Sequence, residues 1–282
     1  MGLFSRNFNK PGPGVRKDEP RKKGAARFFE LLFRDLGDLV KLNMMFCICV
    51  LPSLVMFGMG LMYDSVIALA VSLLLAFPIG GAIVAAVYYI TKMMRDDPSY
   101  VWFEFKRKFL ENFKQAAPIG MICTAFVYAQ IMLWVSFVLG AQEGAGGDIV
   151  WFFIALLSLL VFGIITPYIF LHLAYVELKS LKTLKNSVLM SFGYLPRSFM
   201  GAVAGGLLWI VFALFLPVSL IFVPVILILA VSFSMLMGLM WIWPPFNNHF
   251  KIEETLLARL EEEAEKDQET AKQEMTKQGI EK

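Results

Sequence analysis

Long uncharged runs of apolar residues alternate with charged segments along the chain. The uncharged runs cover residues 42–63, 65–91, 118–142, 149–176 and 198–250. About 20 apolar residues in a helix cross the hydrocarbon core of a bilayer, which is about 30 Å thick. Each of the first four runs therefore predicts one membrane-spanning helix.

The last run is too long for a single span. As one helix, residues 198–250 would extend roughly 80 Å, far more than a bilayer accommodates. Pro217 and Pro224 are the predicted breaks, because proline removes a backbone donor and clashes with the preceding turn. The chain is thus expected to form six spans, at about residues 42–63, 65–91, 118–139, 150–174, 199–216 and 219–242.

Composition supports a membrane protein. The 282 residues are 58% hydrophobic and 17% charged, with a mean hydropathy of +0.65, whereas soluble domains average about 45–50% apolar and about 25% charged. The apolar content and the presence of only three cysteines exclude a disordered chain and a secreted disulfide scaffold. We therefore predict an all-α fold, a polytopic membrane helix bundle of six transmembrane helices with amphipathic cytoplasmic helices.

Basic residues are confined to four segments. All 26 Lys and Arg residues lie within 1–41, 92–117, 177–198 and 251–282. In the six-span topology these segments share one side, and the connectors at 63–65, at 140–149 and near Pro217 share the other. Cytoplasmic loops carry the Lys and Arg excess, so both termini are predicted to be cytoplasmic. The expected parts are a disordered basic tail at 1–26, an integral membrane domain at 27–250 and a charged cytoplasmic helical tail at 251–282.

An amphipathic segment precedes every odd-numbered span. Its polar positions are Arg27, Glu30, Arg34, Asp38 and Lys41 in the first segment. The second carries an aromatic stripe of Trp102, Phe105, Phe109 and Phe113, and in the third Leu181, Leu184 and Val188 oppose Lys179, Lys182 and Asn186. Two interpretations are open. Such helices lie at the membrane surface as elbows between spans, the interpretation we favour, or they form a cytoplasmic platform that binds a partner.

Few side chains in the spans can carry chemistry. The sequence has no carboxylate pair, metal-ligand cluster, phosphate-binding loop or Ser–His–Asp set, so we predict no enzymatic activity and no catalytic, cofactor-binding or metal-binding residue. His172 is a functional candidate or, as we favour, an interfacial anchor beside Tyr168 and Tyr175. Gln130 is expected to form a hydrogen bond between helices. Substrate-binding residues stay unassigned.

Helix breaks inside two spans raise a second possibility. Pro78 and Pro167 are expected to interrupt their helices, the first within a bend or non-helical stretch at 77–81. Unwound backbone that lines a cavity is typical of transporters, whereas simple packing kinks are the other explanation. Small residues after Pro78, from Gly80 to Ala86, should let a neighbouring helix approach closely.

Short motifs between Arg27 and Gly120 carry a family resemblance. They are Leu42-Asn43, Leu51-Pro52, Pro78–Ala82, Tyr88–Lys92, Tyr100–Phe103 and Phe109–Ala116. Through them the region resembles the amino-terminal half of the YesL-like family of uncharacterised bacterial integral membrane proteins. Leu184–Ser187 and Leu195-Pro196 resemble its carboxy-terminal half, so the resemblance covers about residues 27–245. The chain departs from the family pattern by a full extra apolar run before Pro78.

The resemblance implies a location in a bacterial cytoplasmic membrane and an association with carbohydrate uptake. The resulting hypothesis is a non-enzymatic accessory protein that docks to a sugar transporter or a sensing complex. The alternative is a small-solute transporter or channel. The lipid bilayer is an expected partner, and a nucleic acid is not. The oligomeric state is left open.

The charge map makes a topological prediction. A membrane-impermeant thiol reagent applied to intact cells should label single cysteines at positions 64 and 145. It should spare cysteines at positions 20, 100, 185 and 270 until the cells are permeabilised. Labelling of position 100 or 185 from outside would contradict the six-span arrangement.

Overall fold

The computed structural model describes residues 22, 24–97, 99–142, 149–176, 179–214, 226–258 and 262. Within them the regular secondary structure is entirely helical. The elements are α1 (Ala25–Arg34), α2 (Leu36–Met62), α3 (Val66–Leu75), α4 (Phe77–Met94), α5 (Val101–Gln142), α6 (Ile149–Tyr175), α7 (Ser180–Gly193), α8 (Leu195–Leu214), η2 (Ile226–Ala230) and α10 (Val231–Phe250).

The prediction of an all-α polytopic membrane bundle is confirmed. Five helical stretches in the described chain are long and apolar enough to cross a membrane: Leu36–Met62, Val66–Met94, Val101–Phe137, Val150–Tyr175 and Ile228–Phe250. A sixth follows if α7 and α8, which are bent by 98° at Tyr194, count as one broken span. The predicted breaks at Pro217 and Pro224, most of the loop 140–149 and most of both tails lie outside the described residues.

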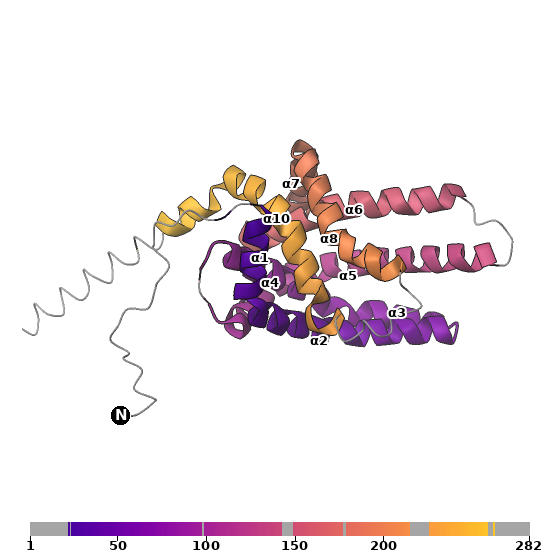
Figure 1. Ribbon diagram of the computed structural model, residues 1–282. Coiled ribbons are helices and arrows are strands. Elements are labelled where there is room, and N and C mark those ends of the chain that lie inside the picture. The colour runs from indigo at the N-terminus through magenta and orange to yellow at the C-terminus, as the bar shows by residue number, and fades with distance from the viewer. Residues whose placement is uncertain are drawn as a thin grey trace, which may run out of the picture.

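Two long helical hairpins extend from one end of the molecule in the same direction. In Figure 1, the α2–α3 hairpin and the α5–α6 hairpin extend the same way, and α1 lies across the end from which they start. The described Lys and Arg residues gather at this end, where α2, α5 and α8 begin and α4, α6 and α10 finish. We call it the basic end. At the opposite end, α2 and α3 are joined by the predicted turn at Tyr63–Ser65, in which Asp64 has a φ of 47°.

The hydrophobic core is concentrated at the basic end. The largest fully buried side chains include Leu31, Leu39, Leu42, Ile90, Tyr168, Phe170, Leu171, Ile242 and Phe246, all near the basic ends of their helices. Toward the opposite end large apolar side chains are exposed, as lipid-facing residues are, among them Val66, Leu74, Ile131, Leu133 and Leu157. The predicted surface segments before the first and third spans therefore take part in a packed core, whereas the segment before the fifth span leaves Leu181 and Leu184 exposed.

Close packing of α4 against α5 confirms the predicted small-residue contact. A Cβ atom added to Gly80 would overlap the Ala116 carbonyl, and one added to Gly120 would overlap the Gly80 backbone. A Cβ atom at Gly81 would lie 3.0 Å from the Phe109 ring. Glycine at these positions lets the two helix backbones touch.

Neither predicted helix break lies where it was expected. Residues 77–81 are helical in α4, and the helix is interrupted only at Ala76, which keeps near-helical torsions (φ −78°, ψ −4°), so the backbone does not unwind. Pro78 is accommodated in the first turn of α4, where its missing N–H costs little. The predicted break at Pro167 is wrong, because α6 continues through it to Tyr175.

Part of the aromatic stripe lies inside the protein. The prediction of a separate elbow before the third span is wrong, because α5 is one helix from Val101 through Pro118 to Gln142. Phe105 is buried, and Phe109 packs on the core next to Gly81. Trp102 is 68% exposed and Phe113 is half-buried. Only Phe105 and Phe109 of the stripe therefore belong to the core.

The last long helix is displaced from its predicted position. A π-helix, Ile226–Ala230, leads into α10, which runs through Pro244 and Pro245 to Phe250, whereas the sequence predicted a span at 219–242. Asn43 in α2 binds the first residues of α10. Its buried Oδ1 accepts hydrogen bonds from the backbone N–H groups of Val231 (2.9 Å) and Ser232 (3.0 Å). The predicted carboxy-terminal helix is seen at 252–258, with Ile252 buried.

The glycine contact generates a matched pair of substitutions. Gly120→Ala should lower the free energy of unfolding by about 1–3 kcal/mol, because its methyl group has no space against Gly80. Gly206→Ala has nothing within 4 Å and should be neutral or slightly stabilising. Thermal unfolding in one detergent measures both. Equal midpoints for the two variants would contradict the contact.

Candidate functional site at the basic end

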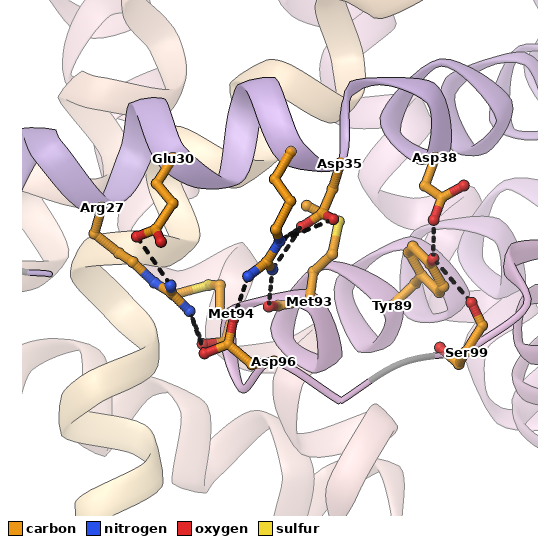
Figure 2. Close-up of polar contacts among 10 residues, drawn as sticks. Arg27, Glu30, Asp35, Asp38, Tyr89, Met93, Met94, Asp96 and Ser99 are labelled. Carbon is orange, nitrogen blue, oxygen red and sulfur yellow. Dashed lines mark hydrogen bonds and ion pairs between the residues drawn. The ribbon is translucent and has the colours of Figure 1, made fainter. Parts of the chain in front are cut away.

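Two arginines of α1 converge on one carboxylate. Arg27 Nη2 lies 2.6 Å from Asp96 Oδ2, and Arg34 Nη1 lies 2.6 Å from Asp96 Oδ1. Arg27 also donates to the Met94 carbonyl at 3.2 Å and to Glu30 at 3.1 Å. We call Arg27, Arg34 and Asp96 the arginine clasp; Figure 2 shows how it ties α1 to the end of α4.

The backbone presents Asp96 to both arginines. Helix α4 ends at Met94, and Asp96 has a φ of 61°, in the left-handed region that aspartate tolerates better than most residues. Partial burial raises the pKa of Asp96, but the hydrogen bonds and positive charges of Arg27 and Arg34 hold it below its ordinary value. Hydrogen bonds to Asp35 and Asp96 in turn raise the pKa of Arg34 against the effect of burial. Asp96 and Arg34 are therefore both ionised at neutral pH.

A hollow of about 250 Å³ lies beside the clasp. It is lined by Arg34, Asp35, Asp38, Tyr89, Met93, Asp96, Asp97 and Ser99. Tyr89 donates a hydrogen bond of 2.9 Å to Asp38, as Figure 2 shows. All four carboxylates of the lining are ion-paired: Asp35 and Asp96 with Arg34, Asp38 with Lys41 (2.9 Å) and Asp97 with Lys92 (3.5 Å).

Further polar contacts join the other helices at this end. Lys92 of α4 lies 2.9 Å from Glu104 of α5. The Arg95 guanidinium lies over the rings of Tyr175 (5.5 Å) and Trp243 (5.6 Å) and donates to the Tyr175 hydroxyl. These contacts link α4 with α5, α6 and α10, so the walls of the hollow rest on a connected scaffold.

His172 is not an interfacial anchor. Its side chain is fully buried, with Nδ1 2.8 Å from the Tyr168 carbonyl and 3.0 Å from Ser187 of α7. The rings of Phe246 and Phe250 pack edge-on against it. An anchor would have to reach the headgroups, whereas this imidazole joins α6, α7 and α10 inside the protein.

Gln130 forms the predicted bond between helices. Its Nε2 donates to Ser158 of α6 at 2.7 Å, while its Oε1 is buried with no hydrogen-bond partner in the described part of the chain. Tyr128, its sequence neighbour, instead shares a 2.7 Å hydrogen bond with Ser53 of α2. A second hollow, of about 20 Å³ between α5 and α6, is lined by apolar residues such as Trp134 and Phe152.

Sequence reasoning did not find the clasp or the hollow. The sequence places Arg27, Arg34 and Asp38 on one polar face of a helix, and nothing in it singles out Asp96. The described residues include no group of three or more His, Cys, Asp or Glu side chains placed to hold a metal ion. Comparison of the chain with protein-family models, curated proteins and solved structures finds no match.

The clasp generates a prediction about α1. Asp96→Asn keeps the left-handed backbone but removes the charge that both arginines share, and should weaken α1 docking by about 1–3 kcal/mol. Hydrogen exchange of the α1 amides should then be roughly 10-fold faster. Asp97→Asn is the control, since Asp97 is 3.5 Å from Lys92 and does not contact α1.

The pH dependence has a definite sign. Because the pKa of Asp96 is lower in the folded chain, its contribution is complete above the ordinary aspartate value of about 3.9. It is lost as the pH falls through the lowered value. Wild-type α1 protection that does not exceed that of the Asp96→Asn variant at neutral pH would refute the clasp.

Proposed function

We propose that this chain is a non-enzymatic accessory protein of a bacterial cytoplasmic membrane, and that its basic end lies in the cytoplasm and binds a protein partner. The orientation rests on the positive-inside rule applied to the four basic segments. The observation that carries the proposal is the hollow lined by aspartates, with the exposed apolar side of α1 next to it.

Helix α1 offers two different surfaces. Arg27 and Leu31 are buried toward the bundle, whereas Phe29 (53% exposed) and Phe33 (73% exposed) point away from it. The two exposed rings stack on each other with centroids 6.3 Å apart. Exposed aromatic residues beside a polar rim are typical of protein interfaces.

Chemistry favours a basic partner segment. Asp38 and Asp97 are partly exposed and would accept a partner's Lys or Arg side chain in exchange for Lys41 and Lys92, while Phe33 would receive an apolar one. Because the clasp fixes α1, this surface is formed before any partner arrives, which reduces the entropic cost of binding. The resemblance to the YesL-like family suggests that the partner belongs to a sugar transporter or a sensing complex.

A small-solute transporter is the second candidate, favoured by the buried Oε1 of Gln130, which has no hydrogen-bond partner among the described residues. The continuous α6 helix through Pro167 and the tight contact at Gly80 speak for a static bundle instead. Purification in mild detergent followed by identification of stoichiometric partners distinguishes an accessory protein from a transporter that acts alone.

Cross-linking tests the docking surface directly. A photo-reactive amino acid at position 33 should cross-link to a protein in intact cells, while the same group at position 122, where Ile122 is 70% exposed on the apolar part of α5, should react with lipid only. Asp38→Asn should reduce the yield at position 33 several-fold, because the hollow loses a charge. An unchanged yield, or lipid adducts alone at position 33, would contradict the proposal.

A further inference from the structure

Helix α7 has an inverted distribution of side chains. Thr183, Ser187 and Ser191 face the protein and are fully buried, and Ser187 contacts the His172 imidazole. Leu181 is 83% exposed and Phe192 is 54% exposed. A helix at a water-exposed surface would bury its leucines and expose its hydroxyls, so α7 requires apolar surroundings on its outer side.

The orientation of α7 indicates that its apolar surroundings are the lipids at the membrane surface. α7 meets α8 at 98°, and α8 enters the apolar part of the bundle. A helix nearly perpendicular to a membrane-entering helix lies along the membrane surface. The Ser187–His172 contact sets its depth one turn before the end of α6, where the apolar run 149–176 gives way to the basic segment.

Positive charge borders the apolar flank. At about 100° per residue, Leu181, Leu184, Val188 and Phe192 share one flank of α7, and the exposed Lys182 and Lys185 follow on the next. Lysine side chains beside a membrane-embedded flank extend toward headgroup phosphates. Each lysine near an anionic surface contributes about 1 kcal/mol, a factor of about five in affinity.

We propose that α7 lies in the leaflet at the basic end and selects anionic phospholipids. Its apolar flank occupies the acyl boundary, and Lys182 and Lys185 bind the headgroup phosphates. The partner is thus a lipid surface, distinct from the protein partner of α1, and the inference does not depend on the proposed function.

Nitroxide labels measure where α7 lies. In a background without the three native cysteines, a label replacing Leu184 in liposomes should collide more with oxygen than with a water-soluble nickel chelate. A label replacing Asn186 should show the reverse, as should a label replacing Phe33 on α1. If position 184 behaves like position 33, the flank is exposed to water and the proposal is overturned.

Lipid selectivity tests the lysines. Spin-labelled phosphatidylglycerol should associate with the wild-type protein more strongly than spin-labelled phosphatidylcholine, in liposomes that contain both. The double variant Lys182→Gln/Lys185→Gln should lose this preference several-fold. The control Lys106→Gln/Lys251→Gln removes two exposed basic charges from α5 and from the end of α10 and should retain it. Equal preference in the two double variants would mean that α7 does not select the headgroup.

Discussion

The contact between Gly80 and Gly120 sets the distance between α4 and α5, and most of the basic end depends on where α4 then lies. From α4, Tyr89 reaches Asp38 of α2 and Thr91 reaches Tyr175 of α6. The α1 arginines bind the carbonyls of Met93 and Met94 at the end of α4 and Asp96 in the turn that follows it. A side chain larger than hydrogen at either glycine would therefore disturb contacts on four other helices.

The basic end is well packed, whereas the opposite end exposes apolar side chains. This difference follows from the surroundings, which are water at the basic end and lipid along the rest of the bundle. In lipid, apolar side chains gain little from leaving their surroundings, so Ile131 or Leu157 can stay exposed, and polar pairs such as Gln130–Ser158 hold the helices together. At the basic end, water makes burial of Leu31 or Phe246 favourable. The segments before the first and third spans consequently bury apolar side chains such as Leu31 and Phe105.

The lengths of the uncharged apolar runs predicted the long helices well. A charged side chain is costly anywhere in lipid, so each span appears in the sequence as a continuous uncharged run. The same reasoning failed for Phe105 and Phe109, because an aromatic stripe at helical spacing suits lipid, a partner or a neighbouring helix equally well. Only Gly81, on another helix, decides among them. The role of Asn43 could not be predicted either, because the backbone N–H group that it binds belongs to Val231, 188 residues later in the chain.

The arginine clasp shows why the candidate site could not be predicted from the sequence. Arg27 and Asp96 are 69 residues apart, and nothing in either local segment distinguishes them from solvated charges. Their pairing arises because α1 lies across the bundle and α4 ends in a left-handed residue. Once paired, they hold α1 with its phenylalanines outward. The sequence shows an ordinary amphipathic helix, whereas the fold buries Arg27 together with Leu31 and leaves Phe29 and Phe33 exposed, and these two rings give the basic end an apolar surface to offer a partner.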